Sequence, residues 1–124
     1  MSDDASRLPD YLGHVQQAIE RIARYTSDMD EAAFRRNTLV QDAVIRNFEV
    51  IGEACRNILR DEPDFAARHP ELPLSGAYEM RNALAHGYFK VDMGVVWTTI
   101  VNDLPSLLSA MRAMAAAIGS GLES

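Results

Sequence analysis

Apolar residues recur every three or four positions along most of the chain, which is the repeat of amphipathic helices. Over residues 7–26 they form one stripe of Leu8, Leu12, Val15, Ile19 and Ile22. Over residues 39–60 they form a second stripe of Val44, Phe48, Ile51, Cys55 and Ile58. Strand-like alternation does not extend beyond a few residues. The pattern therefore predicts an all-α protein.

The sequence allows two starting points for the second helix. It begins at the capping-box pair Thr38 and Gln41, or earlier near Asp30, with Phe34 on its apolar side. Gly52 lies in the middle of this helix, where a glycine costs about 1 kcal/mol relative to alanine. Close approach of another helix is the better explanation for a glycine at this position.

The remaining segments also read as helices. A short helix follows Pro63, and a proline-containing link leads to a helix over residues 75–85 that Gly87 stops. Asp92 caps a last helix, which Pro105 should kink or split. Its predicted buried face is Val96, Ile100, Leu104, Leu107, Met111, Met114 and Ile118.

These elements predict one domain over residues 1–124, with a frayed tail over residues 119–124. The expected architecture is an antiparallel bundle of four main helices with a short extra helix.

Composition narrows the class of protein. Hydrophobic residues make up 48% of the 124 positions, and 24% are charged, as in ordinary globular chains. No apolar run approaches the roughly 18–20 residues that span a bilayer, and the single Cys55 fits a reducing cytoplasm. A formal net charge of −6 argues against a general nucleic-acid-coating protein, but it allows an enzyme with a local basic site.

The run MRNALAHGYF over residues 80–89 concentrates candidate chemistry. The Arg81 guanidinium suits phosphate oxygens, and the His86 imidazole exchanges a proton near neutral pH. Five positions apart on a helix, they point about 140° apart, so they act together only if Gly87 ends the helix. Spacing alone favours a plainer alternative, in which Arg81 forms a surface salt bridge, His86 helps to cap the helix and Tyr88 packs on the bundle.

Other site types find little support in the sequence. His14 lies on the polar side of its helix and His69 in the proline-containing link, so both are expected at the surface. The three histidines and one cysteine lack the spacing of metal ligands. A glycine-rich phosphate loop and a G-x-S-x-G turn are both missing from the sequence.

Three segments together resemble one known family. The series Arg81-Asn82-x-x-x-His86-x-Tyr88 resembles the R-x4-H-x-Y motif of the HepT-like toxins, which are small HEPN-domain proteins. DAVIRNFEVIGEA at 42–54 and VVWTTIVNDLP at 95–105 resemble two further helices of that family, in the same order. The resemblance therefore implies a HEPN-like fold.

The resemblance also implies an activity, that of a metal-independent endoribonuclease acting as a homodimer without a cofactor. His86 would take the proton of the RNA 2′-hydroxyl, and the histidine of the second chain would protonate the leaving 5′-oxygen. Arg81 would stabilise the phosphoryl charge, and Asn82 would orient the phosphate or the histidine. DNA lacks the 2′-hydroxyl and should not be cut.

A protein partner is implied as well. In HepT-like systems a minimal nucleotidyltransferase antitoxin transfers AMP from ATP onto the motif tyrosine, here Tyr88, which would block RNA by bulk and charge. Two alternatives stay open: a non-catalytic module that docks a nucleotidyltransferase and binds nucleotide or RNA, and a purely structural helical dimer.

Asn47 is a weaker candidate, because it falls within the apolar stripe of the helix over residues 39–60. A buried amide needs hydrogen-bond partners. Asn47 therefore either supports the site from the dimer cleft, or it lies on a solvated face or makes a local hydrogen bond.

Overall fold

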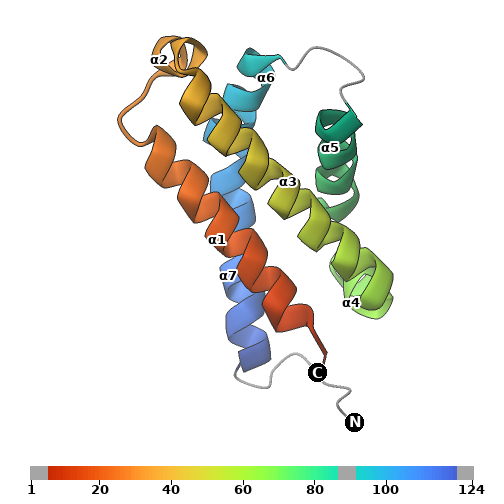
Figure 1. The fold of residues 1–124 in the computed structure, drawn as a ribbon. Coiled ribbons are helices and arrows are strands. Elements are labelled where there is room, and N and C mark those ends of the chain that lie inside the picture. Colours follow the sequence, from red (N-terminus) through yellow and green to blue (C-terminus); the bar gives the residue numbers. More distant parts are fainter. Residues whose placement is uncertain (1–5, 87–91, 120–124) are drawn as a thin grey trace.

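A computed structural model describes residues 6–86 and 92–119, with only the backbone described for Ala85 and His86 (Figure 1). The main helices are α1 (Leu8–Thr26), α3 (Thr38–Asp61), α5 (Leu74–His86) and α7 (Leu104–Gly119). The shorter elements are α2 (Glu31–Arg36), α4 (Pro63–Arg68), α6 (Met93–Thr98) and a π-helical turn, η1 (Thr99–Asp103). The described part contains no strand, which confirms the all-α prediction, with α2 as one more short helix than expected.

Helix α3 is the centre of the bundle and packs against both α1 and α5, while α7 packs against α1 (Figure 1). Every residue of the two predicted apolar stripes on α1 and α3 is buried. On the last predicted helix, Val96, Ile100, Leu104 and Met111 are buried, whereas Leu107, Met114 and Ile118 are half-buried. Within the described ranges, no helix is both long enough and apolar enough to cross a membrane.

The helical structure is interrupted between α2 and α3. Neither predicted start of the second helix is therefore fully correct. The cap of α3 is Asn37 rather than Thr38, and its Oδ1 accepts a hydrogen bond from a first-turn amide at 3.0 Å. The Gln41 side chain donates back to the Phe34 carbonyl at 2.8 Å. Phe34 is fully buried, and its ring centroid lies 5.4 Å from that of Trp97, which fixes α2 against α6.

Pro105 neither ends nor splits the last helix. Its ring would crowd the carbonyl four residues earlier, and it has no N–H to donate. The backbone adjusts just before it, where the Leu104 N–H bonds the Thr99 carbonyl five residues back and forms the π-helical turn. Segments α6, η1 and α7 therefore follow one another without a gap, and Asp92 caps the first of them as predicted.

Polar contacts join α1 to α3 and α7 at two places along its length. The Tyr11 hydroxyl donates to Asp61 Oδ2 at 2.7 Å, and Arg60 donates to the same carboxylate at 2.7 and 3.0 Å. Together the Arg60 guanidinium and the Tyr11 hydroxyl hold the pKa of Asp61 well below its usual range. Farther along α1, Glu20 accepts a hydrogen bond from Arg112 of α7 at 2.8 Å.

Candidate functional site

The candidate site forms where α5 crosses α3 at Gly52. A Cβ atom at Gly52 would overlap the Cβ of Arg81 and would lie 2.8 Å from the carbonyl oxygen of Ala77. A residue with a side chain would therefore push α5 away, which confirms the predicted close approach. The contact fixes the backbone of Arg81 against α3.

The Arg81 guanidinium is held on two sides. Nη1 donates to Asn82 Oδ1 at 2.9 Å, and Nη2 lies 3.4 Å from Glu53 Oε1. This Glu53 oxygen is buried and accepts no hydrogen bond within the described residues, so the second contact is an ion pair without hydrogen-bond geometry. The Arg81 side chain keeps 32% exposure, so part of its donor set remains open to solvent.

Tyr78 is a member of this cluster that the sequence motif does not include. Interaction with Asn82, and after it with Arg56, lowers the pKa of Tyr78 below its usual value. Arg56 Nη1 also lies 3.7 Å from Glu53 Oε2. The one sequence signal for Tyr78 is its position four residues before Asn82, which places both on one face of a helix.

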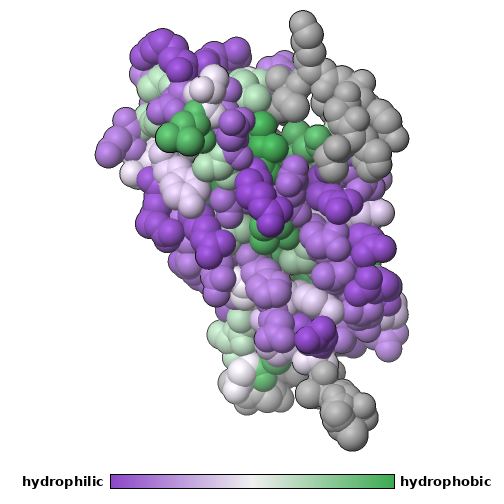
Figure 2. All heavy atoms as spheres, in the orientation of Figure 1, coloured by the Kyte–Doolittle hydropathy of each residue, from purple (hydrophilic) through white to green (hydrophobic). Residues whose placement is uncertain are grey.

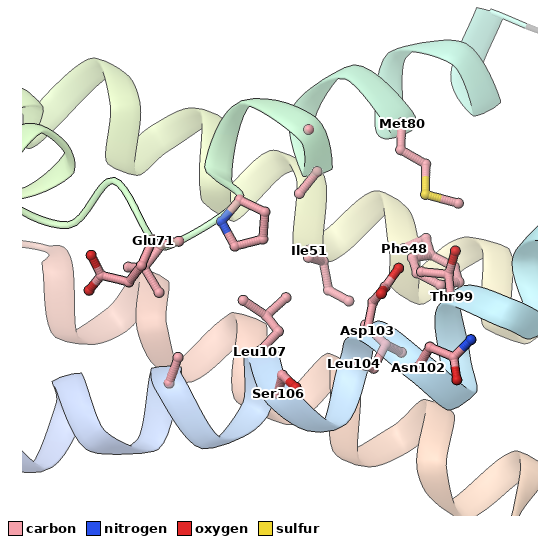
Figure 3. A pocket seen from close by; sticks show the side chains of 15 residues that line it. Phe48, Ile51, Glu71, Met80, Thr99, Asn102, Asp103, Leu104, Ser106 and Leu107 are labelled. Carbon is pink, nitrogen blue, oxygen red and sulfur yellow. The ribbon is translucent and has the colours of Figure 1, made fainter.

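Two hollows border α5. A polar hollow of about 370 Å³ is lined by His14, Arg46, Glu49, Val50, Glu53, Ala54, Asn57 and Arg81. An apolar groove of about 570 Å³ runs between α5 and the η1–α7 segment, with Met80 on one wall, Leu107 on the other and Phe48 and Ile51 at its base (Figure 3). The neighbouring residues Met80 and Arg81 thus line different hollows, one apolar and one polar.

One face of the molecule is mostly polar. Figure 2 shows that polar side chains dominate the face turned toward the viewer and that apolar ones gather in small areas. Two carboxylates and two guanidinium groups line the polar hollow, so their formal charges cancel there.

Of the other predicted site residues, the structure describes some and leaves others outside the described ranges. His86 is the last residue of α5 and therefore lies on the same helix as Arg81 and Asn82. Gly87 and Tyr88 lie outside the described residues, so the helix stop and the modification site stay predictions. The expected tail over residues 119–124 lies outside them too, apart from Gly119, which ends α7.

Asn47 makes a local hydrogen bond, which was one of its predicted alternatives. It is only 6% exposed, and its Nδ2 donates to the Ala43 carbonyl, one turn back on α3, at 2.9 Å. Support of the site from a dimer cleft stays a prediction for this residue.

Two other polar residues behave differently from each other. His14 is exposed, as predicted, although it lines the polar hollow. His69 is less exposed than predicted but not buried: its side chain is 14% exposed, its ring lies 4.6 Å from that of Phe65, and Nδ1 lies 3.0 Å from a Glu71 carboxylate oxygen. The contact of the His69 ring with the Phe65 ring, across the end of α4, covers part of the His69 side chain.

Cys55 is buried in α3, and burial raises the pKa of its thiol to about 12. At neutral pH it is therefore a protonated, inert core residue and not a nucleophile.

Comparison with known proteins identifies relatives over most of the chain. The family model described as "Ribonuclease HepT-like" matches residues 15–114. A "Probable ribonuclease HepT" of Thermococcus cleftensis is 43% identical over 98 residues, which cover 79% of this chain and 86% of that protein. No solved structure gives a significant match.

Further relatives carry related names. A Methanocaldococcus jannaschii protein named "Gamma-glutamylcyclotransferase and putative RNase" is 39% identical over 97 residues, which cover 78% of this chain but only 42% of that protein. A shorter "Putative RNase" of the same organism is 32% identical over 96 residues, 77% of each chain. On the family model and these relatives, the chain belongs to the HepT-like ribonuclease family.

Proposed function

We propose that this protein is an endoribonuclease that cleaves RNA without a metal ion and serves as the toxin of a type II toxin–antitoxin system. One observation carries the proposal: Arg81, partly exposed and braced at the crossing of α3 and α5, shares its helix with His86 in a chain of the HepT-like ribonuclease family. A guanidinium held in this way offers directed donors to phosphate oxygens, and five residues along the same helix lies a group that can move a proton.

In the proposed reaction the RNA supplies its own nucleophile. His86 takes the proton of a 2′-hydroxyl, the 2′-oxygen bonds to phosphorus, and the bond from phosphorus to the 5′-oxygen breaks. A second histidine, from a partner copy of the chain, protonates the leaving 5′-oxygen. Arg81 stabilises the charge that develops on the phosphoryl oxygens, and Asn82 orients the phosphate or the histidine. The products are a 2′,3′-cyclic phosphate and a 5′-hydroxyl.

The proposal includes control by a minimal nucleotidyltransferase antitoxin that transfers AMP from ATP to Tyr88. The added phosphate and its bulk would lie seven residues beyond Arg81 in the chain, where negative charge repels RNA. Co-expression with such an enzyme should raise the mass of the protein in AMP units, and Tyr88→Phe should abolish the increase. An unchanged mass of the unsubstituted chain would count against this control.

The decisive experiment measures cleavage of a short labelled single-stranded RNA in the presence of EDTA. We expect His86→Ala to slow cleavage by about 10²- to 10⁴-fold and Arg81→Ala by about 10²- to 10³-fold. Arg24→Ala, which removes an exposed arginine from α1, makes the same charge change and should cleave normally. DNA of the same sequence should stay intact.

The possible results separate the candidate functions. Equal cleavage by the wild type and His86→Ala would exclude the proposed role of His86. Tight binding of RNA or nucleotide with no turnover would instead select the non-catalytic binding module, which the ion pair of Arg81 with Glu53 and the net charge of −6 favour.

A further inference from the structure

Glu53 on α3 is shared between two guanidinium groups. Its Oε1 lies 3.4 Å from Arg81 Nη2 on α5, and its Oε2 lies 3.7 Å from Arg56 Nη1, three residues along its own helix. Both distances exceed the range of about 2.7–3.2 Å for an N–H···O hydrogen bond. Oε1 is buried and accepts no hydrogen bond from any described residue. The carboxylate therefore balances the charge of both arginines without hydrogen-bonding either one.

Arg81 has a stronger contact on its other side. Asn82 Oδ1 accepts a hydrogen bond from Arg81 Nη1 at 2.9 Å, which fixes the direction of the guanidinium, whereas the contact of Nη2 with Glu53 is only ionic. Arg81 and Glu53 both line the polar hollow, and their side chains keep 32% and 44% exposure. A phosphate oxygen entering this hollow can accept the hydrogen bond that Glu53 does not.

Loss of Arg81 to a ligand would not leave Glu53 without a counter-charge. Its second oxygen stays beside Arg56, and its partly exposed side chain stays accessible to water. A buried carboxylate with no partner would be costly, and the second arginine avoids that cost. The pair of Arg81 with Glu53 can therefore open without creating an isolated charge.

We propose, on the basis of the function proposed above, that Glu53 is a displaceable counter-ion that sets the affinity of Arg81 for RNA. In the free chain Glu53 neutralises the guanidinium. When RNA binds, a phosphodiester oxygen takes its place on Arg81, and Glu53 keeps its contact with Arg56. The phosphate and the displaced carboxylate repel each other, because they carry like charges a short distance apart. Glu53 therefore weakens RNA binding.

The first test is equilibrium binding of Glu53→Gln to a short labelled single-stranded RNA, measured by fluorescence anisotropy at low salt. Methylation of the 2′-hydroxyls of this RNA blocks the nucleophile, so binding is measured without cleavage. The glutamine keeps the shape of the side chain and removes its charge. The Kd should fall about three- to five-fold, the range expected for one exposed ion pair. Glu53→Ala should change Kd in the same direction.

Glu31→Gln is the matched control. It makes the same change in net charge and breaks the ion pair of Glu31 with Arg35 on α2, where the two side chains lie 2.9 Å apart. Neither residue lines the polar hollow. The Kd of this variant should stay close to that of the wild type. An equal fall in Kd for both glutamine variants would mean that net charge alone matters, and it would overturn the proposal.

A double-mutant cycle assigns the effect to Arg81. Arg81→Ala should weaken RNA binding, and Glu53→Gln should have no further effect on Kd in that background, because the ion pair is already gone. A gain in affinity that persists without Arg81 would contradict the counter-ion role. Unchanged or weaker binding by both Glu53 variants, with the fold verified by circular dichroism, would contradict it as well.

Cleavage kinetics connect the counter-ion to the proposed function. In Glu53→Gln the KM for unmodified RNA should fall by about the factor seen in Kd, with little change in kcat, because Glu53 opposes binding of the substrate and of the transition state equally. A lower kcat would instead identify Glu53 as a support that holds Arg81 in place, and the proposal would fail. A wild-type chain that binds RNA without cleaving it would refute the proposed function, and the binding results would then decide the role of Glu53 alone.

Discussion

Gly52 shows how much of the candidate site depends on one missing side chain. Its position brings the backbone of α5 close enough for Arg81 to pack directly on α3. The sequence shows a glycine in mid-helix and suggests a close neighbour, but it cannot identify Arg81 as that neighbour. The identity depends on the register of two helices that are far apart in the chain.

We predict that Gly52→Ala lowers the free energy of unfolding by about 1–3 kcal/mol, because the added methyl overlaps Arg81 and crowds the Ala77 carbonyl. Gly13→Ala in α1 is the matched control, since a Cβ there meets no atom within 4 Å. It should raise stability by about 0.5–1 kcal/mol, as removal of a helical glycine usually does. Urea denaturation of both variants measures the difference, and equal stability of the two would refute the close crossing.

At the scale of elements, the helices themselves were predictable because their causes are local. The stripes on α1 and α3 and the cap at Asp92 follow from neighbours in sequence, and the structure confirms them. The ion pair of Arg81 with Glu53 was not predictable, because these two side chains meet only after α5 has packed on α3. The partial burial of His69, by contrast, involves a local ring contact with Phe65, four residues earlier in the chain.

The contact between α1 and α3 at Asp61 should make stability depend on pH. Arg60 and Tyr11 depress the pKa of Asp61 in the folded chain. Its contribution is therefore present above the unfolded value of about 3.9 and is lost as the pH falls toward the folded value. We predict that Asp61→Asn has a lower free energy of unfolding than the wild type at pH 7. This difference in free energy should be smaller at pH 3.

Urea denaturation at both pH values measures this gap. The effect should be modest, since the Asp61 side chain is 35% exposed and solvent screens its pairing with Arg60. Asp28→Asn, in the exposed turn after α1, serves as the control and should show no comparable narrowing. A gap that stays constant or widens in acid would contradict the assignment.

For the whole molecule, the proposed reaction needs two histidines, and one chain supplies only one His86. The proposed active unit is therefore a pair of chains, and mixing active and inactive chains tests it. If both histidines are required, a 1:1 mixture of wild type and His86→Ala, after full exchange, should keep about a quarter of the wild-type rate at equal total protein.

Independent sites would give a different result from the same mixture. If each chain works alone, the rate should fall only to about half. Initial rates over a series of mixing ratios distinguish a quadratic from a linear dependence on the wild-type fraction, and sedimentation velocity establishes the size of the particle. A linear dependence would refute the shared site.

The π-helical turn at Thr99–Asp103 has a consequence for how this fold can change over evolutionary time. Such a turn holds one residue more than the α-helical path between the same two ends. Removal of one residue there would restore ordinary helix while the faces of α6 and α7 kept their directions toward α2 and α1. The number of residues in the last helix can therefore change by one at this point without a change in the packing of α6 and α7.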